Sequence, residues 1–186
     1  MDFIRETVSG DGNDGQDAAY GCIFCQTGKE KSVARSVEKN YPTVRAFSPE
    51  KSIRRRSGGR FTEEERILFP GYVFFRANAC FPAERIGDMA GVLRVLRGQD
   101  SGWALQGEDR AFAEWLFRFD GRIGFSKAWF EGEKIRILQG PMKGFEGKIV
   151  RVNKRHQNAM IKVRFDTREI DVWLGYDLIG PAAEQN

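Results

Sequence analysis

The residues with the clearest capacity for chemistry are two closely spaced cysteines, Cys22 and Cys25. Such a pair can bind a metal ion or form a redox-active disulfide, but a structural zinc site needs four ligands, usually from two pairs. Cys80 and the single histidine, His156, lie far away in the sequence. Residues 20–25 are typical of a strand, in which positions three apart point to opposite faces. We therefore expect both cysteines to lie in the hydrophobic core. Metal binding is the second alternative and redox chemistry the third, and no cofactor is expected.

A second group with chemical potential is a run of cations near the C-terminus. Residues 134–168 hold ten lysines and arginines against Glu146 and Asp166, while the whole chain has a net charge of +4. A charge run is usually a solvated surface, but so one-sided an excess favours a polyanionic partner, most commonly nucleic acid. The candidate RNA-binding residues are Lys143, Lys148, Arg151, Lys154, Arg155, Lys162, Arg164, Arg168 and Trp173.

These candidates have different expected roles. Alternation of apolar residues along 159–165 buries every second side chain and leaves Lys162 and Arg164 outside. The same alternation along 170–174 places Trp173 outside, where it would stack on a base. An equal alternative is that Trp173 packs on the linker or the N-terminal domain. The lysines and arginines would hold phosphates, through contacts that weaken with salt.

No combination of residues predicts an enzyme. The sequence has no phosphate-binding glycine loop, no metal-ligand set and no Ser/His/Asp arrangement, and Glu63, Glu64 and Glu65 are typical of a solvated turn beside Arg66. No apolar run approaches the roughly 20 residues that cross a bilayer. The N-terminus lacks the basic start and apolar stretch of a signal peptide. We expect a cytoplasmic monomer that does not bind membranes.

The first two thirds of the chain predict a small α/β sandwich. Thr27 and Glu30 have the spacing of a helix capping box, and the helix should stop before Pro42. Residues 108–119 are the clearest amphipathic helix. Strands are expected at residues 20–25, 44–47, 67–75 and 92–96. A polar hairpin or loop is expected at residues 51–60, and a short helix at residues 82–89.

Composition changes after Phe119, where glycine turns separate about five short alternating strands, as in a small barrel. The predicted organisation is an acidic disordered leader, the sandwich, a linker and the barrel, at residues 1–19, 20–121, 122–128 and 129–181.

The stretch 131–150 of the barrel resembles the KOW motif, a strand, a Gly-Pro loop and a second strand. Gly140, Gly144 and Gly147 supply the backbone freedom that a tight loop in a tiny barrel needs. Independently, residues 68–73 resemble the characteristic strand of the N-terminal (NGN) domain of NusG-type elongation factors.

Residues 20–30 resemble the opening strand and first helix of the same domain. The resemblance covers residues 20–180 and implies an α+β fold, an NGN sandwich with an antiparallel sheet followed by an SH3-like KOW barrel. It also implies docking on the clamp helices of RNA polymerase through an aromatic patch. On matching positions that patch is Phe69 and Tyr72, with Tyr20 nearby, for which core packing is an equal alternative.

One position departs from the general factors of this family. Where their barrel carries an exposed aromatic that engages the ribosome or the Rho terminator, this chain has Asp166. The Arg-rich hairpin, the 143–147 loop and the basic barrel resemble the LoaP group of antiterminators. The expected function is therefore a processivity factor that binds polymerase and a nascent RNA hairpin, with non-template DNA as a further candidate partner. Alternatives are a general NusG-like factor coupled to Rho or the ribosome, and a ribosomal or plain RNA-binding protein, which would not need the apolar strand at 67–75.

Overall fold

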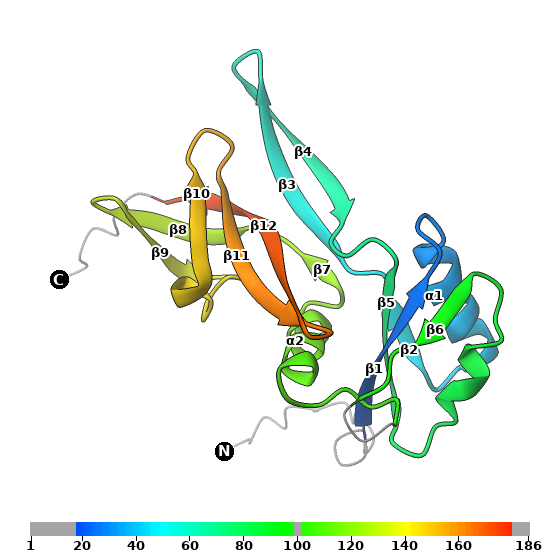
Figure 1. Ribbon diagram of the computed structural model, residues 1–186. Coiled ribbons are helices and arrows are strands. Elements are labelled where there is room, and N and C mark those ends of the chain that lie inside the picture. Colours follow the sequence, from blue (N-terminus) through cyan, green and yellow to red (C-terminus); the bar gives the residue numbers. More distant parts are fainter. Residues whose placement is uncertain (1–17, 99–101, 180–186) are drawn as a thin grey trace, which may run out of the picture.

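The computed structural model of the chain describes residues 18–98 and 102–179 (Figure 1). Most of the predicted acidic leader lies outside the described residues. Its last two residues, Ala18 and Ala19, already belong to the first strand, β1 (Ala18–Cys25), so the leader prediction is too long by two residues. Both alanines pair with the ends of a neighbouring strand, opposite Asn78 and Ala77.

The N-terminal domain is built on a four-stranded sheet in the order β2-β5-β1-β6, with a helix on each face. Its antiparallel pairs join β1 to both β5 and β6, and β5 to β2. The elements are β1, α1 (Glu30–Asn40), β2 (Arg45–Phe47), β5 (Tyr72–Asn78), η1 (Ala83–Ile86), β6 (Val92–Val95) and α2 (Gly107–Arg118).

Strand β1 separates two apolar clusters, because alternate side chains point to opposite faces of the sheet. Ile23 and Cys25 pack with α1, whereas Cys22 packs with α2. The predicted placement of the two cysteines on opposite faces is confirmed, and both are buried. Gly21 lies where a Cβ atom would come within 2.2 Å of the Phe75 ring, so the sheet has no room for a side chain there.

Helix α1 forms where it was expected and ends two residues before Pro42. Val33, Ala34 and Val37 line its buried face. The predicted capping box is wrong, because Lys29 occupies the N-cap and no side chain caps the helix. The Glu30 carboxylate instead accepts hydrogen bonds from the backbone of the loop before the helix and from a turn 41 residues away.

A long β-hairpin projects from this domain and consists of β3 (Glu50–Ser57) and β4 (Arg60–Ile67) (Figure 1). Gly58 and Gly59 turn the chain, with φ values of 57° and 80° that favour glycine. The predicted hairpin at 51–60 is confirmed but extends to residue 67. Glu63, Glu64 and Glu65 therefore lie within β4, which corrects their assignment to a solvated turn.

The C-terminal part is the predicted small barrel, whose strands follow the order β10-β11-β12-β8-β9. Buried and exposed residues alternate along β11, as expected, and the buried ones are Ala159, Ile161, Val163 and Phe165. Its elements are β8 (Ser126–Glu131), β9 (Lys134–Gln139), η2 (Glu146–Lys148), β10 (Ile149–Asn153), β11 (Asn158–Phe165) and β12 (Arg168–Leu178).

The segment between the two parts is more ordered than a linker. Within the predicted linker 122–128, Arg122 and Ile123 form β7, which pairs in parallel with β3. Strand β8 begins at Ser126, inside the same segment. The physical reason is burial, since Ile123 and Ser126 are almost fully enclosed. The fold class is α+β, as predicted.

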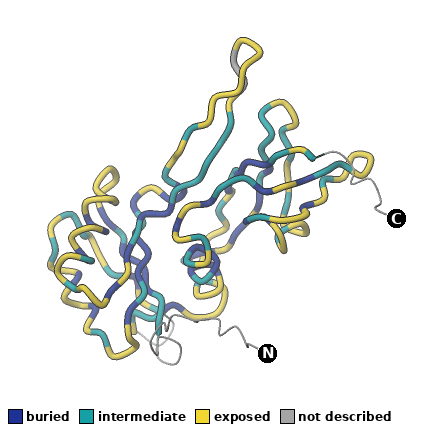
Figure 2. Tube along the Cα trace, turned by 180° about the vertical axis from the view of Figure 1, so that it is seen from behind, coloured by how far each residue is buried: buried dark blue, intermediate teal, exposed yellow. Residues whose placement is uncertain are grey.

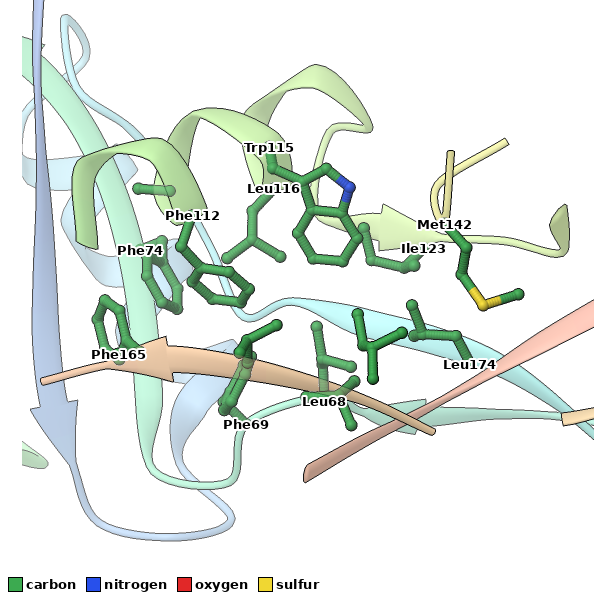
Figure 3. Packing of buried hydrophobic residues seen from close by; sticks show 14 of the residues in the cluster. Leu68, Phe69, Phe74, Phe112, Trp115, Leu116, Ile123, Met142, Phe165 and Leu174 are labelled. Atoms are coloured by element: carbon green, nitrogen blue, oxygen red, sulfur yellow. The ribbon is translucent and has the colours of Figure 1, made fainter. Parts of the chain in front are cut away.

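The two domains share one apolar core. Figure 3 shows side chains of α2, the 68–74 region and the barrel packed against each other without a break. Trp115 of α2 donates a hydrogen bond from its indole N–H to the carbonyl of Pro141 in the barrel, at 2.9 Å. Met142, next to it, is fully buried. The domains are therefore in close contact.

Candidate interaction surfaces

The turn that carries the predicted docking residues is held by a buried carboxylate. Glu30, 1% exposed, accepts hydrogen bonds from the amides of Gly28 at 2.8 Å and Gly71 at 2.7 Å. Burial alone would raise the pKa of the Glu30 carboxyl, but hydrogen bonds from the amides of Glu30 itself, Gly71 and Gly28 outweigh burial and lower this pKa. Gly71, at φ 85°, allows the sharp turn between Phe69 and Tyr72.

Beyond this turn, one face of the N-terminal sheet carries a group of aromatic rings, here named the aromatic face. Phe69 is 4% exposed and Tyr72 is half-buried. Phe69 packs edge-on against Phe112 of α2, with ring centroids 5.2 Å apart. The members of the aromatic face are Phe24, Phe69, Tyr72, Phe74 and Phe112.

The aromatic face is covered by one side chain from the barrel, Phe165, at the end of β11 (Figure 3). Its ring centroid lies 5.1 Å from that of Phe74, 5.6 Å from Phe112, 6.0 Å from Tyr72 and 6.4 Å from Phe69. All four rings belong to the N-terminal domain. Phe165 is 1% exposed because it contacts that domain, so the barrel buries the residues predicted to bind polymerase.

Tyr20 lies elsewhere on the sheet. It is half-buried and packs on Phe117 of α2, with ring centroids 5.1 Å apart. No ring contact among the described residues joins Tyr20 to Phe69 or Tyr72. The structure therefore brings together two of the three residues predicted for the docking patch.

Polar contacts surround Phe165 where the β11–β12 turn meets the N-terminal domain. The Asp166 amide donates to Asp109 Oδ1 at 3.1 Å, and the Asp166 carboxylate lies 3.6 Å from Arg94. Burial raises the pKa of Asp109, with a further contribution from the nearby Asp166 charge. Asp166 and Thr167 both have positive φ, 50° and 62°, which is uncommon for such residues. The barrel therefore contacts α2 and β6 through a strained turn.

A second junction joins the hairpin to the barrel and centres on Arg54. Its guanidinium donates to Asp177 and Gln157 of the barrel, each at 2.8 Å, and to Glu63 of β4 at 2.6 Å. The same group lies over the Phe125 ring, 4.4 Å from its centroid. These bonds to two carboxylates raise the pKa of Arg54 against the effect of its burial.

Residues 19–111 match the family model NusG, described as transcription termination factor nusG, and residues 131–162 match the KOW motif. The chain belongs to the NusG family. Its domains are those of a transcription elongation factor that associates with RNA polymerase, and neither kind of domain is catalytic. Among the described residues, no helix is long and apolar enough to span a membrane.

A solved structure titled "Domain interaction in Thermotoga maritima NusG" is similar in fold. The alignment covers 85% of this chain and 93% of that one, with 21% sequence identity and a TM-score of 0.53. At this identity the similarity concerns the NusG fold alone. No curated protein matches the chain.

The cations predicted to bind RNA are all exposed on the KOW barrel, but some are neutralised. Lys162 contacts Glu169 at 3.2 Å and Asp171 at 3.6 Å, and Arg164 lies 3.8 Å from Glu108 of α2. Two of these acids, Glu169 and Asp171, lie just beyond the cationic segment 134–168. The outer face of β11 and β12 is therefore less cationic than the sequence predicted.

The remaining cations fall into separate groups. Lys148 shares a shallow cleft with Lys162 and Arg164. Lys154 and Arg155 lie in the β10–β11 turn, where the Lys154 ammonium is 4.4 Å from the centroid of the Phe130 ring. Trp173, half-buried, lies opposite Met160 in the β11–β12 ladder, on the same outer face as Lys162. Lys143, Arg151 and Arg168 are exposed at other points of the barrel.

Three residues of this NusG-type protein were not predicted as functional from the sequence. Phe165 was expected in the barrel core, Arg54 in a polar hairpin and Glu30 only in a helix cap. Each contacts residues more than 40 positions away, so local periodicity carries no information about its partner. Arg54 lies in a run of three arginines without a neighbouring acid, a signal that does not distinguish it from Arg55 and Arg56.

Proposed function

We propose that the chain is a transcription elongation and antitermination factor. It docks on the RNA polymerase clamp helices through the aromatic face and holds structured nascent RNA on its KOW barrel, so that the polymerase becomes more processive. The observation that carries the proposal is the aromatic face itself, a contiguous group of rings in a NusG domain. It is covered by Phe165, at the β11–β12 turn. Aromatic side chains of this kind are enriched in binding hot spots.

Docking at this face requires the barrel to move. Phe165 occupies the centre of the face, so polymerase and the barrel compete for the same rings. A ligand shifts such an equilibrium only by its differential affinity for the two states. The ion pairs around Phe165 are exposed and contribute little to the closed arrangement, so the main cost of release is the separation of the shared apolar core. The Thermotoga maritima structure reports a domain interaction in its title as well.

RNA binding by the barrel rests on its remaining unpaired cations and on Trp173. Lys143, Arg151, Arg155 and Arg168 form no ion pair with any residue in the described ranges, and all are exposed. Phosphates would bind these groups, with Lys148 and Lys154 beside aromatic rings.

The alternative is a general NusG-like factor that modulates pausing and couples to Rho or the ribosome. Asp166 argues against it, because this position faces Asp109 and Arg94 instead of presenting an aromatic ring. We expect the chain to bind Rho and ribosomal protein poorly. Micromolar binding of the full chain to either, detected by NMR titration, would restore the alternative.

Transcription with purified RNA polymerase tests the function directly. Templates carry either a leader that forms a stable RNA hairpin or a scrambled leader, upstream of a terminator. The protein should increase read-through on the structured leader, and Tyr72→Ser should remove the increase. Lys154→Ala with Arg155→Ala should reduce the effect only on the structured leader. Equal read-through on both leaders would favour the general factor.

A further inference from the structure

Hairpin β3–β4 projects away from both domains, and the hydrogen bonds that join its described residues to the barrel lie at Arg54, below its tip (Figure 1). Figure 2 shows its end as exposed chain, in contrast to the buried segments at its base. A two-stranded ribbon without an apolar face gains little stability from its own contacts. Its side chains are therefore candidates for binding a partner.

The two faces of the hairpin differ in what they contact. Residues directly opposite each other in an antiparallel pair point to the same side. The side of Arg54 also carries Phe61 and Glu63, and it turns to the barrel, where Arg54 bonds Asp177 and Gln157. The other side is here named the Arg55 face and consists of Lys51, Ile53, Arg55, Arg60, Thr62, Glu64 and Arg66.

The Arg55 face is strongly cationic. Its four cations, Lys51, Arg55, Arg60 and Arg66, stand against one acid, Glu64, which pairs with Arg66 at 2.7 Å. Neither Arg55 nor Arg60 forms an ion pair with any residue that the structure describes, and both are exposed.

Two cations of this face also oppose each other. Lys51 lies directly across from Arg66, and burial, with a contribution from Arg66, lowers the pKa of the lysine. Like charges in opposite positions of a β-ladder destabilise it. An anionic partner along this face would relieve that repulsion.

The shape of the hairpin favours one kind of polyanion. The major groove of B-form DNA admits a two-stranded β-ribbon, whereas that of an A-form RNA helix is deep and narrow. From this shape and the cations we propose that the Arg55 face of hairpin β3–β4 binds the phosphate backbone of duplex DNA. The site is separate from the KOW surface proposed for RNA and does not depend on it.

The test measures binding of the full chain to a fluorescent DNA duplex of about 20 base pairs, long enough for two helical turns, across a series of salt concentrations. The variant Arg55→Gln with Arg60→Gln should bind roughly 10-fold more weakly at low salt, and its salt slope should fall by about two. Arg35→Gln with Arg85→Gln removes the same charge from exposed positions of α1 and η1 and should bind like the parent.

Two further measurements distinguish the hairpin site from the RNA-binding surface proposed for the KOW barrel. An RNA duplex of equal length should bind more weakly than DNA and should not respond to the hairpin variant. Lys154→Gln with Arg155→Gln should weaken binding of leader RNA and should leave unchanged the loss of DNA binding that the hairpin variant causes. Failure of the RNA proposal can therefore be distinguished from failure of the DNA proposal.

The proposal is overturned if the parent does not bind the DNA duplex, or if the hairpin variant binds no worse than the Arg35 and Arg85 control. It is also overturned if the hairpin variant loses only RNA binding. Loss of polymerase binding with DNA binding intact would identify the face as a protein contact instead.

Discussion

At the scale of single residues, Glu30 illustrates both what sequence patterns reveal and what they miss. Its spacing from Thr27 indicated an acid at a helix start, and the helix does begin at Glu30. The pattern did not reveal that the carboxylate would be buried and bonded to Gly71, because that contact spans 41 residues. Glu30 thus joins helix α1 to the turn of Phe69 and Tyr72.

Glu30→Gln should destabilise the fold by about 1–2 kcal/mol at neutral pH, because an amide is a weaker acceptor for two backbone N–H groups. The pKa of Glu30 is lowered in the folded state, so its stabilising contribution is present above the ordinary value of 4.5 and is lost as pH falls through the lowered pKa. Urea denaturation at neutral and acidic pH measures both effects.

The stability gap between parent and Glu30→Gln should shrink below about pH 4.5. Glu84→Gln, at an exposed site in η1, is the matched control and should change stability little at either pH. A gap that stays constant with pH would mean that the charge of Glu30 does not contribute.

At the scale of elements, periodicity predicted the regular parts well. Phe112, Trp115 and Leu116 identified α2, and alternation in β11 identified its buried side. Periodicity could not show that β3 and β4 extend to residue 67, because their side chains are polar on both faces. Periodicity also could not show that Phe165 packs on the N-terminal domain. A residue buried in the barrel and a residue buried in a neighbouring domain give the same alternating pattern.

The β11–β12 turn stores backbone strain that a single substitution should relieve. Thr167, β-branched, adopts φ 62°, where a side chain costs roughly 1–2 kcal/mol. Thr167→Gly should therefore stabilise the protein by up to about 1 kcal/mol, after the entropy that glycine adds to the unfolded chain. Thermal denaturation measures it, with Thr62→Gly in β4 as a control that should destabilise. Equal loss in both variants would show that the turn is not strained.

Trp173 and Lys154 of the barrel should contribute to RNA binding in different ways. Trp173→Ala should weaken binding of structured RNA at all salt concentrations, by about 1–3 kcal/mol, because stacking does not depend on counterions. Lys154→Ala should mainly reduce the salt slope. Fluorescence anisotropy across a salt series distinguishes them. If Trp173→Ala binds like the parent, the tryptophan is structural and only the cations bind RNA.

At the scale of the whole molecule, two junctions join the domains in addition to the contact of Trp115 with the Pro141 carbonyl. One is apolar, with Phe165 on the aromatic face, and the other is ionic, with Arg54 between hairpin and barrel. Neither was predictable from the sequence, since each joins residues more than 50 positions apart. The predicted docking residues were identified by resemblance alone, which could not indicate that another domain would cover them.

Binding of the full chain to a clamp-helix fragment tests whether the face under Phe165 is the polymerase-docking site. Phe165→Ser removes about 1.5–3 kcal/mol of burial from the closed arrangement, so binding should tighten roughly 10-fold or more. Tyr72→Ser should weaken binding roughly 30-fold, with or without Phe165→Ser.

Leu138→Ser, at an exposed barrel site, is the control and should bind like the parent. Circular dichroism should confirm that all variants remain folded. If both Phe165→Ser and Tyr72→Ser remain folded and bind with unchanged affinity, polymerase does not dock on the aromatic face, which then serves domain packing only.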